Sequence, residues 1–167
     1  SSSLSSQKGQ SDISDIVTYT SLGGTFVDAQ KIEYSNYDNY GNAQGQKVTR
    51  RDSAIATSAS IIGIQDITAT YDKFGNALTQ VITSKTADGS AVIDIKSIKN
   101  TYDTITDRQK GQANSTDVVT TASDGTFTSA QKIEYSNYDN YGNAQTQKIT
   151  RRSAADAAAA TTKVLDY

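Results

Sequence analysis

The sequence predicts an all-β protein built from repeated β-hairpins, stacked as an elongated antiparallel sheet or as a solenoid-like array. Three observations lead to this fold class. Segments rich in Thr, Val, Ile and Tyr recur along the 167 residues. Turn signals that contain Gly separate these segments at intervals of about 14–17 residues, a spacing that suits one strand on each side of each turn. A long segment of the chain is also repeated almost without change.

Six segments have the composition of β-strands. They are Thr25–Tyr34, Ala43–Arg50, Leu78–Lys85, Ala91–Ile98, Thr126–Tyr135 and Ala144–Arg151. Apolar and polar residues alternate imperfectly within them, which predicts a thin core with many polar side chains on both faces of the sheet. One short helix is predicted at the C-terminal end, over Ser153–Thr162, because this segment is rich in alanine.

The repeat has two periods. Residues 29–43 recur identically at residues 130–144, an offset of 101 residues, and the likeness continues for eight further positions. Upstream, residues 7–10 match residues 109–112 at an offset of 102, so one residue is gained or lost between the two matches. A shorter period of about 34 residues lies inside the long one, because a turn motif recurs at that spacing.

These periods predict how the chain is divided. Residues 1–14, rich in Ser, Gly and Gln, are expected to form a flexible or strand-donating arm. Residues 15–108 form the first long unit, with three sub-repeats of about 34 residues. Residues 109–167 form a partial second unit that ends in an Ala-rich segment.

The turn motif is Tyr-Asp-x-x-Gly-Asn. Its copies are Tyr37, Asp38, Gly41 and Asn42; Tyr71, Asp72, Gly75 and Asn76; and Tyr138, Asp139, Gly142 and Asn143. Asp suits the first position of a type I turn, where its carboxylate accepts hydrogen bonds from the backbone amides ahead of it, and Gly accepts a positive φ. We therefore expect all three glycines to have positive φ at hairpin turns. A degenerate copy lies at Tyr102–Asp107.

This motif resembles the YD repeat of Rhs and teneurin-type proteins. In that family each repeat makes a β-hairpin, and the hairpins join into one long sheet. Family members are large, exported, surface-located proteins that form shells around toxins or act in adhesion. Here Ser35, Ala69 and Ser136 replace an aromatic residue that usually precedes the motif, and Ala43, Ala77 and Ala144 replace a leucine that usually follows it. The resemblance therefore implies the hairpin and not the closed shell.

Composition excludes several classes of function. The chain has no His, Cys, Met, Trp or Pro, so disulfides, Cys/His zinc sites and catalytic triads with histidine are impossible. Carboxylates duplicated in a repeat are not how a single glycosidase site is built, and we expect neither an enzyme nor a bound cofactor. A net charge of −2 argues against nucleic acid as a partner, and no apolar run is long enough for a membrane span.

The repeated tyrosines are the main candidate contact surface. Tyr34 and Tyr40, which recur as Tyr135 and Tyr141, flank the turn motif. They are interpreted either as a stacking surface for glycans or another chain, or as a ladder of side chains that covers a thin sheet.

Two kinds of charged residue also recur. The turn aspartates, together with Asp88 and Asp124, are interpreted as turn caps or as calcium ligands, although each turn supplies a single carboxylate. The arginine pairs Arg50–Arg51 and Arg151–Arg152 are interpreted as solvated, or as paired with acids of a neighbouring repeat.

These features together predict a structural role. The chain is expected to be a self-assembling subunit or fragment of an extracellular fibre, sheath or surface stalk, with copies of itself as partners. The alternatives are a carbohydrate- or cell-binding adhesin module that uses the tyrosine face, and part of an Rhs-like toxin-delivery shell. The predicted location is extracellular or at the cell surface.

Overall fold

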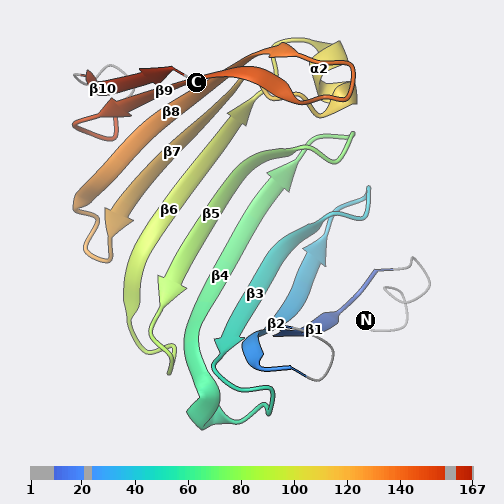
Figure 1. The fold of residues 1–167 in the computed structure, drawn as a ribbon, viewed down its shortest axis with the longest axis vertical. Coiled ribbons are helices and arrows are strands. Elements are labelled where there is room, and N and C mark those ends of the chain that lie inside the picture. The colour runs from blue at the N-terminus through green and yellow to red at the C-terminus, as the bar shows by residue number, and fades with distance from the viewer. Residues whose placement is uncertain (1–9, 21–23, 157–160, 167) are drawn as a thin grey trace. The chain divides into compact units, whose positions relative to one another are not determined.

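The structure, a computed structural model, describes residues 10–20, 24–156 and 161–166. Ten β-strands form one antiparallel sheet in which each strand lies beside the next one in the chain, from β1 to β10 (Figure 1). The strands are β1 Ile13–Tyr19, β2 Phe26–Tyr37, β3 Ala43–Arg51, β4 Ile61–Tyr71, β5 Ala77–Lys85, β6 Val92–Thr101, β7 Ser115–Ala122, β8 Phe127–Tyr138, β9 Ala144–Arg152 and β10 Thr161–Asp166. This confirms the predicted all-β fold of hairpins, in its sheet form.

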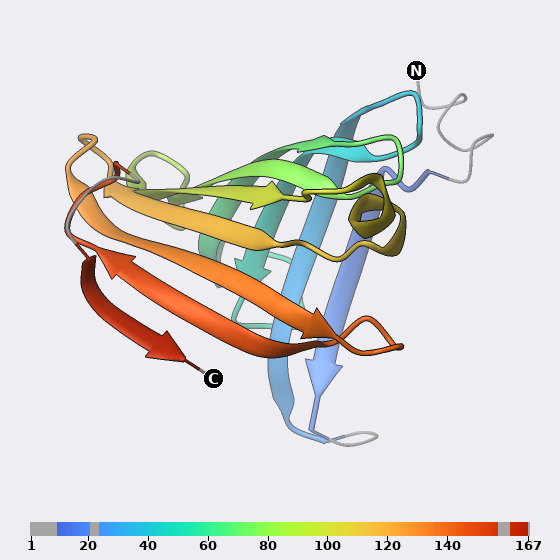
Figure 2. The same cartoon turned by 90° about the horizontal axis from the view of Figure 1, so that it is seen from above.

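The chain divides into two compact units. The first contains Ser1–Thr68 and Ile82–Ile93, and the second contains Ala69–Val81 and Asp94–Tyr167. Figure 2 shows the second unit from above, where β7, β8, β9 and β10 follow one another as a meander. Most of the predicted N-terminal arm lies outside the described residues, and its last two residues, Ile13 and Ser14, begin β1.

All six predicted strands are present, as β2, β3, β5, β6, β8 and β9. Strands β1, β4, β7 and β10 have no counterpart among the predicted strands. Their place in the sheet comes from pairing with neighbouring strands, which a local pattern does not contain.

The predicted helix over Ser153–Thr162 is wrong. Residues 153–156 form bends, residues 157–160 lie outside the described residues, and Thr161 begins β10. Strand β10 pairs with β9, for example through Val164 and Thr150. A short alanine-rich helix is marginal by itself, and the β-branched residues after it favour the strand ladder that β9 offers.

The described part of the chain instead has its α-helix earlier. Helix α2, Ile105–Lys110, begins at a capping box in which Thr104 and Asp107 exchange hydrogen bonds. It ends at Gly111, which has the left-handed conformation of a helix C-cap. This helix occupies the place of the degenerate turn motif. A single 3-10 turn, η1 at Ser58–Ser60, precedes β4.

The two copies of the long repeat share one local structure. Ala29 lies opposite Arg51 in the β2–β3 hairpin, and Ala130 lies opposite Arg152 in the β8–β9 hairpin. Both hairpins have the same strand bounds when shifted by the 101-residue offset. Each copy also has an asparagine with positive φ near the end of its first strand, 53° at Asn36 and 54° at Asn137.

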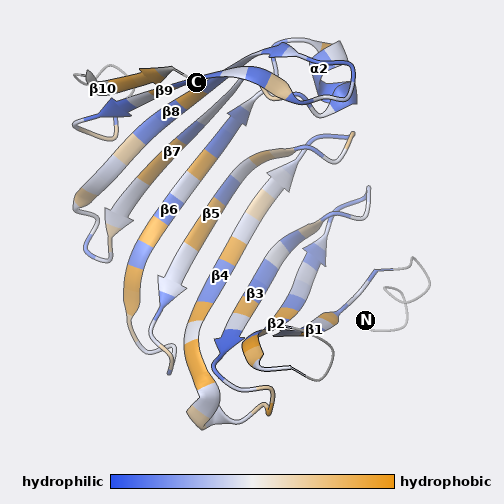
Figure 3. Ribbon diagram, viewed as in Figure 1, coloured by the Kyte–Doolittle hydropathy of each residue, from blue (hydrophilic) through white to orange (hydrophobic). Residues whose placement is uncertain are grey.

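The buried core is thin. Among the described residues only Ala29, Val48, Ala69 and Ala130 are buried hydrophobic side chains. Hydrophobic and hydrophilic residues are interspersed along the strands (Figure 3). Hydrophobic burial therefore contributes less to the stability of this sheet than it does in a fold with two packed layers.

The hairpin turns depend on backbone conformation. The φ angles of Gly41, Gly75 and Gly142 are 92°, 87° and 88°, which confirms the prediction made for them. Gly125, in the β7–β8 turn, also has a positive φ of 84°.

Replacing Gly125 by alanine tests the cost of this conformation alone, because a Cβ there meets no atom within 4 Å. We expect Gly125→Ala to lower the free energy of unfolding by about 1–2 kcal/mol in urea denaturation, since an L-residue is strained at this φ. Gly63→Ala in β4 is the matched control, because its Cβ also meets nothing within 4 Å and its φ is not positive. Equal losses at the two sites would contradict the explanation.

Candidate functional site

A carboxylate caps each Tyr-Asp hairpin. Oδ1 of Asp38 accepts hydrogen bonds from the backbone amides of Tyr40 and Asn42, both at 2.9 Å, and Oδ2 accepts one from Nδ2 of Asn42. The same three bonds form around Asp72 and around Asp139. This confirms the turn-cap interpretation of these residues.

The tyrosine that opens the motif connects its hairpin to an earlier segment of the chain. The hydroxyl of Tyr138 donates a hydrogen bond to the carbonyl of Ala113 at 2.5 Å, just before β7. The hydroxyl of Tyr37 donates in the same way to the carbonyl of Ser11, just before β1. Burial raises the pKa of both tyrosines above its usual value. Tyr71, in the middle copy, is half-buried.

The structure separates the candidate tyrosines by exposure. Tyr34 and Tyr135 are half-buried within their strands, whereas Tyr40 and Tyr141 are exposed at the hairpin tips. Tyr141 is 92% exposed and lines a hollow of about 390 Å³ in the second unit. The hollow is formed by Lys110, Gln112, Tyr138, Asp139, Asn140, Tyr141 and Gly142. The geometry therefore offers a small polar hollow with one exposed aromatic ring.

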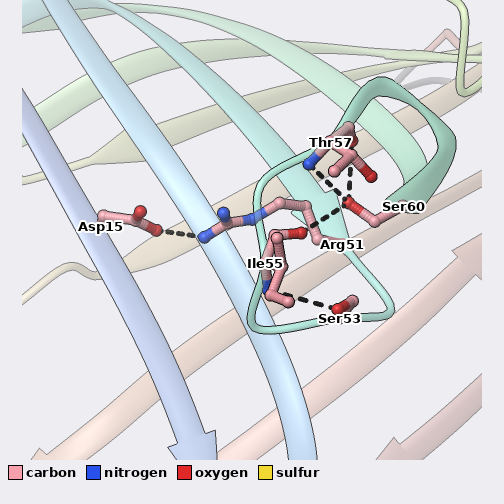
Figure 4. Close-up of polar contacts among 6 residues, drawn as sticks. All are labelled: Asp15, Arg51, Ser53, Ile55, Thr57 and Ser60. Carbon is pink, nitrogen blue, oxygen red and sulfur yellow. Dashed lines mark hydrogen bonds and ion pairs between the residues drawn. The ribbon is translucent and has the colours of Figure 1, made fainter.

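The most buried charged groups lie elsewhere, in a contact that we call the arginine clamp. The side chain of Arg51 starts on β3, crosses β2 and forms an ion pair with Asp15 on β1 (Figure 4). Ala29, the β2 residue directly opposite Arg51, is fully buried. Arg51 itself is 3% exposed. A methyl group on the middle strand leaves room for the arginine to pass over it.

The second unit contains the same clamp. Arg152 on β9 crosses Ala130 on β8 and reaches Asp117 on β7, with an Nη2–Oδ1 distance of 2.6 Å. Arg152 is 6% exposed. Each clamp therefore joins three consecutive strands with one side chain, and in each the Nε atom of the arginine is buried without a hydrogen-bond partner among the described residues.

The loop that connects β3 to β4 follows directly after Arg51 of the first clamp and is held by its own hydrogen bonds. The buried hydroxyl of Ser60 donates to the carbonyls of Thr57 and Ile55, at 2.8 and 3.1 Å, and accepts from the amide of Thr57 (Figure 4). Ser53 accepts a further bond from the amide of Ile55. These bonds order the connection from β3 to β4 at the end of the strand that carries Arg51.

Opposite charges lie next to each other on the same face as each clamp. In the second unit Lys99 lies opposite Asp117, which in turn lies opposite Lys132. Lys132 pairs with Glu134 at 2.9 Å and holds the pKa of that carboxyl below its usual value. These residues line a hollow of about 690 Å³ together with Thr101, Asp103, Asn114, Ser115, Lys148, Thr150, Arg152 and Val164.

The arginine pairs were interpreted as solvated or as paired with acids of a neighbouring repeat. Neither interpretation is fully correct, because Arg50 pairs with Asp28 at 3.5 Å and the buried arginines pair with acids of their own long unit. Arg51 and Arg152 are buried and paired with an acid two strands away, whereas Arg50 and Arg151 are exposed. The burial was missed. A signal for it exists in the sequence, because Asp15 and Asp117 recur at the upstream offset of 102 while the arginines recur at 101.

Within the part of the chain that the structure describes, no three Asp or Glu side chains are grouped so that they could hold a metal ion. In the same part, no helix has the length and apolar character that crossing a membrane requires.

No protein-family model matches the chain, and a search of curated proteins finds no similar sequence. The YD-repeat resemblance stays a prediction.

The clamp predicts a difference between the two adjacent arginines. We expect Arg152→Met to lower the free energy of unfolding by about 2 kcal/mol, because it leaves Asp117 partly buried without its partner. Arg151→Met, its matched control, removes an exposed charge and is expected to change stability by less than about 0.5 kcal/mol. The double variant Arg152→Met with Asp117→Val is expected to recover much of the loss, which urea denaturation of all three variants would measure. Equal losses for the two arginines would contradict the clamp.

The turn aspartates predict acid sensitivity. Hydrogen bonds from Thr86 and Ser90 lower the pKa of Asp88 to about 2, and the Asn42 side chain leads the causes that lower the pKa of Asp38. A carboxyl with a depressed pKa in the folded state stabilises the fold above its unfolded pKa of about 3.9 and loses that contribution as the pH falls. We therefore expect unfolding midpoints in urea to fall between about pH 4 and pH 2. Asp88→Asn should flatten this fall, and an unchanged acid limb would contradict the assignment.

Proposed function

We propose that the chain is a self-assembling structural subunit of an extracellular or cell-surface fibre, sheath or stalk. The observation that carries this proposal is the balance of apolar side chains. Four hydrophobic residues are buried among the described residues, whereas fourteen large ones are exposed. Contacts between copies would remove some of these exposed side chains from water and so supply burial that the thin core lacks.

The arrangement of the strands supports the proposal. The strand order has two ends, β1 and β10, and a strand at the end of a sheet presents unpaired backbone groups to other chains. Repeat proteins gain stability from each neighbouring unit that stacks against the last one. A sheet with a thin core therefore gains most when copies extend it.

Purified protein tests this proposal without any ligand. We expect light scattering to report masses that grow with concentration, and negative-stain microscopy to show filaments or sheets. A double variant with Ile62→Thr and Ile93→Thr keeps β-branched residues while it removes two exposed apolar side chains, and it should assemble at higher concentration than the natural chain. A strictly monomeric protein at high concentration would refute self-assembly.

A carbohydrate-binding adhesin module is the second candidate, and one observation favours it. Tyr141 projects at a hairpin tip beside a polar hollow, and exposed aromatic rings with polar neighbours suit sugars. This function requires a monomer that a glycan surface retains, and Tyr141→Ala should abolish that retention while it leaves the fold unchanged.

A further inference from the structure

Strands β1 and β7 are two copies of one strand. Asp15 and Asp117 lie at the same position of each, and each faces a lysine on the following strand, Lys31 and Lys132. The register shift that ends each pairing also recurs, between Thr18 and Tyr19 in β1 and between Thr120 and Thr121 in β7. The outer edge of β1 therefore has the backbone geometry of the edge of β7.

The two copies differ in what lies beside that edge. Strand β6 pairs with the outer edge of β7, whereas β2 is the only described strand that pairs with β1. Every residue of β7 is half-buried. In β1 six of seven residues are exposed, and Ile16 is 43% exposed. The side chain of Asp15 is 52% exposed, against 31% for Asp117.

The partner of β7 shows which side chains suit this edge. Opposite Asp117 it places Lys99, and opposite Val118 it places Ile98. Transferred to β1 by the repeat, the same register puts a lysine opposite Asp15 and an isoleucine opposite Ile16. Opposite charges and β-branched pairs in direct cross-strand positions both stabilise a sheet.

Strand β10 does not meet this requirement. Val164 lies opposite Thr150, which places Val164 on the face of the sheet that carries the clamp and Asp117. An added β10 would therefore bring a valine to the face that carries Asp15, and its sequence contains no isoleucine followed by lysine. Direct addition of β10 from a second copy is a poor match for the edge of β1.

We propose that the outer edge of β1 is a docking edge for an extended polypeptide with the pattern of β6, added antiparallel with lysine opposite Asp15 and isoleucine opposite Ile16. Main-chain hydrogen bonds supply the general attraction in such strand addition, and the cross-strand side chains set its register. The docking edge is distinct from self-assembly, because its partner needs an isoleucine followed by a lysine, which β10 lacks. It also does not require the chain to form fibres.

A synthetic peptide of Val92–Thr101, capped at both ends and labelled with a fluorophore, tests the proposal on the full chain. We expect saturable binding in fluorescence anisotropy, with peptide concentrations up to the millimolar range. Hydrogen exchange followed by NMR should show new protection at those backbone amides of Ile13–Tyr19 that point away from β2. A peptide with Lys99→Glu should bind about five-fold more weakly, because a like-charge pair replaces an opposite-charge pair beside Asp15.

A pair of matched changes tests the register. The protein variant Ile16→Lys should weaken binding of the natural peptide, and a peptide with Ile98→Glu should restore it by pairing with the new lysine. Val164→Lys, on the exposed edge strand at the other end of the strand order, is the control and should leave peptide binding unchanged.

Three results would overturn the proposal. They are no saturable binding, binding that protects amides outside β1, and protection in the free monomer of those β1 amides that point away from β2. The test is separate from that of self-assembly. Filaments without peptide binding would support the proposed function and refute the docking edge. Peptide binding by a strictly monomeric protein would support the docking edge and refute self-assembly.

Discussion

The contact on which the two units depend is a buried arginine that crosses an alanine to reach an aspartate two strands away. Arg51 and Arg152 each tie three strands together, while the hydrophobic core around them consists mainly of single alanines. A buried ion pair contributes little net stability when compared with apolar packing, but removing one partner of it is costly. The clamp therefore contributes more to fixing the arrangement of its three strands than to enlarging the hydrophobic core.

This role matters because polar side chains occupy both faces of the sheet. A strand with one apolar and one polar face cannot slip by a single residue without exposing its core, but a strand that is polar on both faces can. Here the register is set by specific pairs instead, such as Asp117 with Lys132 and Glu134 with Lys148. The positive φ at Asn36 and Asn137 adds a local irregularity at the same place in each copy.

The hairpin turns could be predicted from local chemistry, whereas the strands that depend on longer-range pairing could not. The turns follow from Asp and Gly at fixed spacing, so the positive φ of Gly41 and the carboxylate caps were expected from a few neighbouring residues. Strands β1 and β7, which carry the acid of each clamp, and the end of the Ala-rich segment, which forms β10, depend on partners distant in the sequence. The exposure of the tyrosine side chains could not be predicted from the sequence either, since Tyr34 and Tyr40 flank the same turn motif but differ in burial.

The same specific pairs explain why the edge of this sheet is selective. An edge strand with a regular apolar face accepts many partners through its backbone alone, which is the usual route to aggregation. Asp15 is held in place by Arg51, so the carboxylate stays at a fixed point on the edge and meets any strand that is added. A partner with a carboxylate at that point places a second negative charge beside Asp15, whereas a partner with a lysine places an opposite charge there. Asp15, the carboxylate of the first clamp, therefore also discriminates among partners. The stability of the clamp and the choice of partner both depend on this side chain.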